Sequence, residues 1–151
     1  MIIDLRTLKR SGKDQADFFF EYQPTDELCA IPSAQIQPPI KVNGTVSLTG
    51  DHSAYIEGEI CFTISGECTR CLSPAEVNVV ATFNEQVEKD NEYGYSLVND
   101  KINLVEIVDE CILLNMPVSL LCKQDCKGIC LGCGTNLNDG DCKCKNKQEG
   151  I

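Results

Sequence analysis

Hydrophobic and polar residues alternate over two long stretches in the middle of the chain. The even positions of residues 54–64 are apolar or glycine, whereas the odd positions are mainly polar. Apolar residues at 77, 79, 81, 83 and 87 repeat this pattern on the odd positions, and a shorter run covers residues 42–48. Successive side chains of a strand point to opposite faces. The pattern therefore predicts three strands, each with one buried and one solvent-facing side.

The segments before these strands give weaker signals. Residues 1–22, including the stretch 17–22 (DFFFEY), favour short strands. Four prolines lie between Pro24 and Pro39 and predict a loop or an extended edge path, because proline removes a hydrogen-bond donor from a sheet.

One helix is predicted near position 104. Apolar residues at 104, 107, 108, 111 and 112 form one helical stripe. Asn103 can cap its start, Glu106 stands at the capping-box position, and Pro117 ends it. Cys111 lies on the stripe and is expected to be buried. Cys29 and Cys61 have no cysteine nearby in sequence, and we expect them to be inert.

Together these elements predict an α+β fold. It consists mostly of antiparallel β-sheet with one main helix and a small C-terminal cysteine-rich zinc knuckle. The expected division is an α+β domain over 1–121, a metal-binding tail packed on it over 122–147, and a flexible end over 148–151. No apolar run is long enough to span a bilayer, so we expect no membrane partner.

Charge is unevenly distributed along the 151 residues, whose formal net charge is −10. Residues 1–121 contain 8 Lys/Arg and 19 Asp/Glu, whereas residues 122–151 contain 5 Lys and 4 Asp/Glu. A broad basic face for nucleic acid is therefore not expected. Any RNA contact is expected at the basic first 13 residues or at the tail. The acidic middle is either a solvated face or a surface that docks a basic partner.

The chemistry is concentrated in the cysteines. There are 11 of them against one histidine, and six lie within 23 positions of the tail: Cys122, Cys126, Cys130, Cys133, Cys142 and Cys144. The first ten residues hold Asp4 and Arg6 and no long apolar run, which predicts no secretory signal and a reducing, cytoplasmic location. Clustered cysteines in such a protein favour metal ligands or redox thiols.

A zinc knuckle is predicted at Cys130 and Cys133. Two thiolates two residues apart bind one tetrahedral ion through a tight turn, and Gly132 and Gly134 permit the positive φ angles of such a turn. A structural site needs two more ligands. Cys142 and Cys144 are one source, and Cys126 or Cys122 is the other. Zn²⁺ is the first-choice metal, and an iron–sulfur cluster or unliganded thiols are the alternatives.

Cys68 and Cys71 form a separate pair at the tip of a predicted hairpin. This pair either completes a zinc site shared with Cys130 and Cys133, as in a zinc ribbon, or serves as structural or redox thiols. Redox pairs of this spacing usually open a helix that lowers the thiol pKa. Here Pro74 and a strand pattern follow, which disfavours the redox reading.

Three stretches resemble the YceD family. Residues 68–72 (CTRCL) are similar to its C-x-R-C signature, residues 109–117 (DECILLNMP) to its acidic-then-apolar helix, and residues 125–138 (DCKGICLGCGTNLN) to its DCxGLCxxCGxNLN tail. The resemblance implies a non-enzymatic ribosome biogenesis factor that supports large-subunit rRNA accumulation. The implied partners are a pre-large-subunit particle, a basic ribosomal protein or rRNA, and the tail zinc is a structural staple.

Enzyme classes find little support in the sequence. The single histidine, His52, lies in a predicted turn, with no nucleophile that sequence alone would match to it. Phosphate-cradling glycine motifs are absent from the sequence. The alternative to a ribosome role is a thiol redox or zinc-handling protein that uses the Cys68–Cys71 pair and the cysteine cluster.

Overall fold

The computed structural model describes residues 1–144. The flexible end expected at 148–151, and the last residues of the expected tail, lie outside this range. The described elements are β1 (Ile2–Asp4), α1 (Leu5–Arg10), β2 (Gln15–Tyr22), the 3-10 helix η1 (Asp26–Leu28), β3 (Ala34–Gly50), β4 (Ser53–Glu67), β5 (Pro74–Glu88), β6 (Lys101–Asn103) and α2 (Leu104–Asn115).

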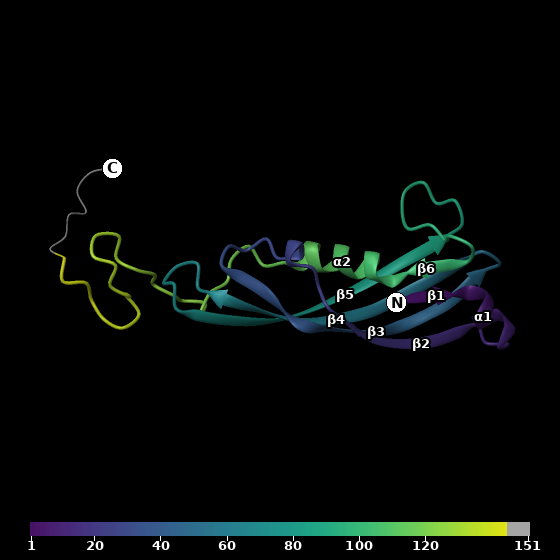
Figure 1. Cartoon of the computed structure of the whole chain (residues 1–151), viewed down its shortest axis with the longest axis horizontal. Helices are drawn as coiled ribbons and strands as arrows, with labels where there is room; N and C mark the ends of the chain where they lie inside the picture. Colours follow the sequence, from purple (N-terminus) through teal and green to yellow (C-terminus); the bar gives the residue numbers. More distant parts are fainter. Residues whose placement is uncertain (145–151) are drawn as a thin grey trace.

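A four-stranded antiparallel sheet forms the body of the molecule (Figure 1). Its strand order is β2-β3-β4-β5, and β4 pairs with β5 over the whole length from Ser53–Glu88 to Glu67–Pro74. The predicted alternation is confirmed, because Ile56, Ile60 and Ile64 are fully buried while their odd-numbered neighbours face outward. A second, small sheet pairs β1 with β6.

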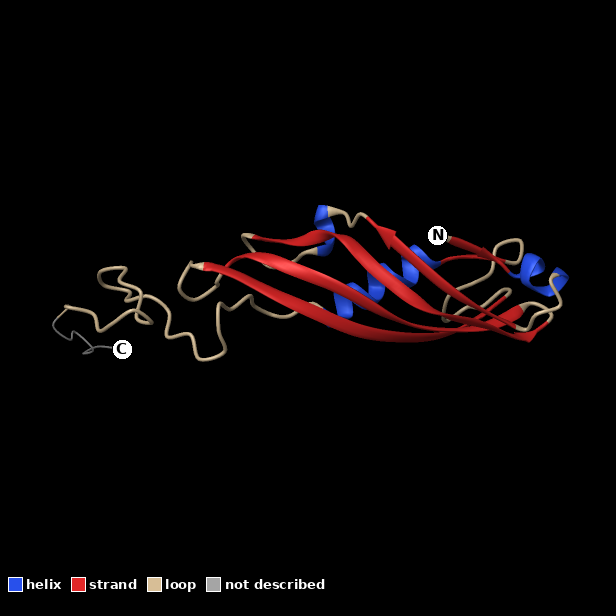
Figure 2. Cartoon of the chain, turned by 90° about the horizontal axis from the view of Figure 1, so that it is seen from below, coloured by secondary structure: helices blue, strands red, loops and turns tan. Residues whose placement is uncertain are grey.

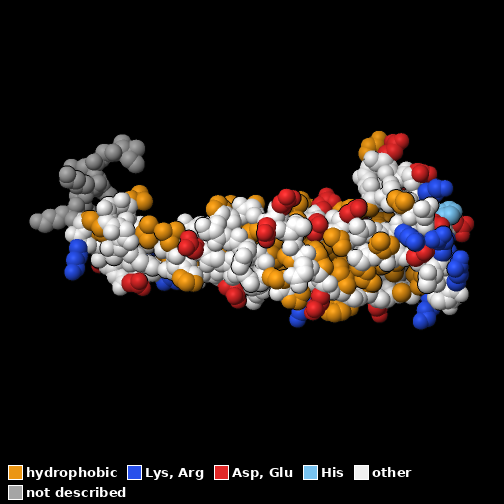
Figure 3. Space-filling model, viewed as in Figure 1, with side chains coloured by type: hydrophobic (Ala, Val, Ile, Leu, Met, Phe, Trp, Pro, Cys, Tyr) orange, Lys and Arg blue, Asp and Glu red, His pale blue; other side chains and the backbone are white. Residues whose placement is uncertain are grey.

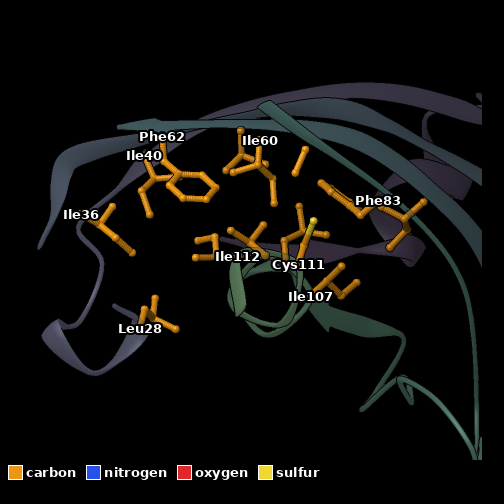
Figure 4. Close-up of a cluster of buried hydrophobic side chains, with 14 of the residues drawn as sticks. Leu28, Ile36, Ile40, Ile60, Phe62, Phe83, Ile107, Cys111 and Ile112 are labelled. Atoms are coloured by element: carbon orange, nitrogen blue, oxygen red, sulfur yellow. The ribbon is translucent and has the colours of Figure 1, made fainter. Parts of the chain in front are cut away.

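Helix α2 covers one face of the long sheet (Figure 2). Its apolar stripe is buried and points at the strands, as Ile107, Cys111 and Ile112 show in Figure 4. The side chain of Asn103 accepts a hydrogen bond from the Val105 amide, which confirms the predicted N-cap. The α+β fold with one main helix is therefore confirmed, and the buried position of Cys111 with it.

Two facing glycines let aromatic rings cross the sheet. Gly44 pairs with Gly58, and a Cβ at these positions would lie 2.6 Å from ring carbons of Phe18 and Phe83 respectively. Both rings are buried. The missing side chains of the two glycines leave space that the two phenylalanine rings fill. The hydrophobic core therefore has no gap on β3 between Val42 and Val46.

The prediction of short strands over residues 1–22 is wrong in one detail. Residues expected as short strands include helix α1, which Asp4 caps by accepting from the Arg6 amide and which buries Leu5 and Leu8. A six-residue helix is too short to show helical periodicity. The proline segment agrees with the predicted loop or extended edge path, since β3 begins at Ala34 and its residues 34–39, which include Pro38 and Pro39, lack a β2 partner and so lie at the sheet edge.

The tip of the β4–β5 hairpin lies far from the end that α1 closes. Figure 1 shows the chain leaving α2, passing this tip and continuing beyond it as the tail. The structure of residues 1–144 contains no helix with the length and apolar character of a membrane span. The hairpin tip, which holds Cys68 and Cys71, therefore lies beside the segment that begins with Cys122 and Cys126.

The packing of α2 predicts a sharp contrast between two of its aliphatic side chains. Ile112 is fully buried, whereas Leu114 is 79% exposed. Ile112→Ala should lower the free energy of unfolding by about 2–5 kcal/mol, because it leaves a cavity between helix and sheet. Leu114→Ala should change it by less than about 0.5 kcal/mol. Urea unfolding of both variants measures this, and equal effects would contradict the described packing.

Candidate metal centres

Eight cysteines gather into two groups of four at the tip of the sheet and in the tail. The hairpin cluster consists of Cys68, Cys71, Cys122 and Cys126, and the tail cluster consists of Cys130, Cys133, Cys142 and Cys144. The sulfur atoms within each group all lie within 4.8 Å of one another. The chain therefore presents two sets of four thiols, each compact enough to surround a single ion.

A tight turn positions the first half of the tail cluster. The Cys130 amide donates to the Thr135 carbonyl over 2.8 Å, and the Gly134 amide donates to the Cys130 carbonyl over 2.8 Å. Gly134 has a φ of +73°, a conformation that favours glycine. Gly132, also expected to use a positive φ, does not adopt one; its amide instead approaches the Cys130 sulfur at 3.4 Å.

The sulfur spacing fits a tetrahedral thiolate site better than disulfides. In the tail cluster the Cys142 sulfur lies 3.4 Å from that of Cys133 and 3.2 Å from that of Cys130. A disulfide bond is about 2.05 Å long, whereas Zn–S bonds of about 2.3 Å place tetrahedral sulfurs about 3.8 Å apart. Zn²⁺ suits sulfur-only tetrahedral sets, so the residues present fit this ion.

The thiols within the tail cluster affect each other's ionisation. Hydrogen bonds from the side chain and backbone of Thr135 lower the pKa of Cys133 to about 6. In contrast, the hydrogen bond to Cys142 raises the pKa of Cys144 to about 12. One thiolate therefore forms readily, but additional thiolates at this distance repel it. A bound cation would remove this repulsion and allow all four sulfurs to ionise.

The hairpin cluster is more enclosed than the tail cluster. Cys68 is 0% exposed, Cys71 6% and Cys126 4%, whereas Cys122 is an exposed residue. Burial raises the pKa of Cys68, but backbone hydrogen bonds from Cys71, Cys122 and Arg70 outweigh burial and bring it to about 6. The zinc-ribbon arrangement, in which Cys68 and Cys71 would share a site with Cys130 and Cys133, is not the grouping found. Cys122 and Cys126 lie beside Cys68 and Cys71 instead.

Two asparagines organise the chain between the clusters. Asn138 accepts a hydrogen bond from the Lys127 amide at 2.9 Å, and its amide nitrogen lies 3.3 Å from the Cys126 sulfur. Asn136 donates to the Ser73 hydroxyl, which belongs to the hairpin tip, over 3.2 Å. Residues 135–138 (TNLN) therefore connect the hairpin cluster to the knuckle of the tail cluster. This role of the two asparagines could not be predicted from the spacing of the cysteines.

The remaining candidate residues lie apart from both clusters. His52 is in the β3–β4 turn, its side chain is 57% exposed, and its Nδ1 atom is 2.7 Å from an Asp100 carboxylate oxygen. The hydrogen bond to His52 lowers the pKa of Asp100. Cys29 and Cys61 are half-buried and belong to neither group of four.

Comparisons with known proteins match the chain to one protein family. Residues 56–150 match the family model described as "Large ribosomal RNA subunit accumulation protein YceD". An uncharacterized protein of Mycobacterium tuberculosis is 29% identical over 92 residues, which cover 54% of this chain and 44% of that protein. No solved structure matches the chain.

Two plant proteins are also similar to the chain. Both are named large ribosomal RNA subunit accumulation protein YCED homolog 1, chloroplastic. The maize protein is 29% identical over 76% of this chain and 52% of its own length, and the Arabidopsis thaliana protein is 31% identical over 62% and 40%. The chain thus spans about half the length, or less, of these curated relatives.

The hydrogen bonds of Asn138 predict a local loss of protection in the tail. Asn138→Ala should speed hydrogen exchange of the Lys127 amide about fivefold, for a loss of about 1 kcal/mol, because that amide loses its acceptor. Asn138→Asp keeps an acceptor oxygen and should leave this amide protected. Hydrogen exchange followed by mass spectrometry compares the variants, and equal exchange rates would contradict the assigned contact.

Proposed function

Because the chain belongs to the YceD family, we propose that it is a non-enzymatic ribosome biogenesis factor that supports accumulation of large-subunit rRNA. The observation that carries the proposal is the family match, which spans both cysteine clusters and all of α2. The names of the plant relatives support it, because both name accumulation of large-subunit rRNA. The proposed site of action is a precursor of the large subunit in the cytoplasm.

The outer face of the long sheet supports a basic protein as the direct partner. The face opposite α2 carries acidic side chains from three strands: Asp17, Glu21, Glu57, Glu59, Glu76 and Glu88. Lys41 is the one Lys or Arg in β2–β5. Such a face repels phosphates and attracts a positively charged surface, so we propose that a basic ribosomal protein docks on it.

Contacts to rRNA are proposed at the ends of the molecule. Lys and Arg side chains gather at the two ends, whereas acidic ones are spread along the middle (Figure 3). Helix α1 and its flanks supply Arg6, Lys9, Arg10 and Lys13, and the tail supplies Lys123 and Lys127. A few cations at each end can position phosphates but do not make a broad nucleic-acid surface.

A structural Zn²⁺ in the tail cluster is part of the proposal. Leu131 is fully exposed, and among apolar side chains of 122–144 only that of Cys126 is buried. A segment without a core of its own cannot offset its conformational entropy by apolar burial. Metal binding by Cys130, Cys133, Cys142 and Cys144 would supply that folding free energy.

The alternative of a thiol redox or zinc-handling protein is less well supported. Redox thiols need access for their exchange partner. Cys68 and Cys71 are nearly fully buried and lead into a strand instead of opening a helix. This environment favours a structural role for the pair.

Fractionation of cell lysates tests the ribosome role. The full-length protein should comigrate with pre-large-subunit particles on a sucrose gradient, and its depletion should lower mature large-subunit rRNA. A protein that stays at the top of the gradient, with unchanged rRNA on depletion, would contradict the proposal.

Charge reversal on the sheet tests the proposed docking face. Glu57→Lys with Glu59→Lys should reduce comigration about tenfold, because the outer face would then repel a basic partner. Asp26→Lys with Glu27→Lys makes the same change in charge on η1, away from this face, and should leave comigration intact. Equal losses for both pairs would show a general charge effect and contradict a specific face.

Loss of tail ligands tests the structural zinc. Cys130→Ser with Cys133→Ser should remove the tail ion and speed hydrogen exchange in residues 127–144, while β4 and β5 stay protected. Cys29→Ser serves as the control and should change neither zinc content nor exchange. Unchanged zinc content and unchanged tail exchange in the double variant would contradict the site.

A further inference from the structure

We propose that Cys68, Cys71, Cys122 and Cys126 form a second tetrathiolate site, which holds its own Zn²⁺ and ties the β4–β5 hairpin tip to the start of the tail. The chain would then bind two ions, one in each cluster. This inference goes beyond the tail zinc of the proposed function and does not depend on the ribosome role.

The turn at the hairpin tip has the same backbone geometry as the knuckle of the tail cluster. The Cys68 amide donates to the Ser73 carbonyl over 2.8 Å, as the Cys130 amide does to Thr135. The Leu72 amide donates to the Cys68 carbonyl over 2.9 Å, which repeats the bond from Gly134 to Cys130. The two turns therefore share both hydrogen bonds at equal sequence offsets.

The residue after the second cysteine adds a further match. Leu72 has a φ of +64°, close to the +73° of Gly134. A left-handed conformation is uncommon for a leucine, and its side chain is largely exposed, so burial of that side chain does not explain it. The sulfurs of Cys68 and Cys71 lie within 4.8 Å of each other, as do those of Cys130 and Cys133, and the short sequence C-x-x-C-x-[Ser/Thr] is common to both turns.

Two cysteines from beyond α2 complete the hairpin cluster. The sulfur of Cys126 lies 3.7 Å from that of Cys68, and the sulfur of Cys122 lies 3.5 Å from that of Cys71. Both distances are near the spacing of about 3.8 Å that four sulfurs adopt around Zn²⁺. A structural zinc site has four protein ligands and no open position. Here one turn would supply two of them and a distant segment the other two.

Polar contacts hold the two segments in place around this site. The Thr69 amide donates to the Leu120 carbonyl over 2.8 Å, and the Arg70 guanidinium donates to the Cys126 carbonyl over 3.0 Å. Asn138 approaches the Cys126 sulfur at 3.3 Å with its amide nitrogen. Hydrogen bonds of this kind orient ligands and stabilise thiolates around a metal.

The proposed ions differ in their surroundings. Three of the four hairpin-cluster cysteines are buried, whereas Cys133 and Cys144 of the tail cluster are exposed. Loss of an ion from the hairpin cluster requires the sheet tip and the tail to separate, whereas the tail cluster can open alone. A chelator is therefore expected to remove the tail ion first.

Native mass spectrometry of the full chain with reduced thiols and Zn²⁺ tests the proposal. Wild type should bind two ions, and Cys68→Ser with Cys71→Ser should bind one, as should Cys130→Ser with Cys133→Ser. Cys61→Ser, which changes a cysteine of the outer sheet face, should keep two. One ion in wild type that persists in the Cys68→Ser, Cys71→Ser variant would overturn the proposal.

Alkylation of the wild-type protein provides a test that does not depend on the variant folding. Cys122 is an exposed residue, so coordination is what would protect its sulfur from a thiol reagent. Modification of Cys122 should be at least about tenfold slower with Zn²⁺ than after chelation, whereas that of Cys61 should change little. Equal reactivity of Cys122 in both states would overturn the second site. The tail zinc and the ribosome role would be unaffected by that result.

Discussion

The meeting of four cysteine sulfurs at the tip of the β4–β5 hairpin is the contact on which the placement of residues 122–144 depends. The sheet is long, and α2 covers only its middle (Figure 2). Beyond the helix, Leu120 is the last fully buried aliphatic side chain before the tail. Cys122 and Cys126 then return the chain to Cys68 and Cys71, where the proposed ion would join the two segments.

This arrangement places unlike surfaces along one elongated body. The body is held by a hydrophobic core between sheet and helix, and its outer face is acidic. The cations lie at α1 and in the tail (Figure 3). A rigid link at the hairpin tip would hold the tail lysines at a fixed distance from the acidic face, which would favour simultaneous contact with two surfaces of the proposed partner particle.

Much of the fold could be predicted from the sequence, because one face of each long strand is exposed to solvent and the hydrophobic pattern therefore alternates. The period of two in β4 and β5, the stripe of α2 and the Asn103 cap are local signals, and each is confirmed. The family resemblance is confirmed as well, over residues 56–150. Helix α1 was missed because Leu5 and Leu8 give too short a pattern, and Pro38 and Pro39 concealed the beginning of β3.

The grouping of the cysteines could be predicted only in part. Spacing along the chain identified the Cys130–Cys133 knuckle, whereas the partners of Cys68 lie more than fifty residues away and depend on the path after α2. The shared C-x-x-C-x-[Ser/Thr] pattern is the one signal in the sequence that relates the two turns.

X-ray absorption at the zinc edge, combined with the zinc-to-protein ratio, tests the account most directly. Two ions per chain, each with four sulfur ligands at about 2.3 Å, are expected. A single ion, or a first shell that contains nitrogen or oxygen, would contradict the account.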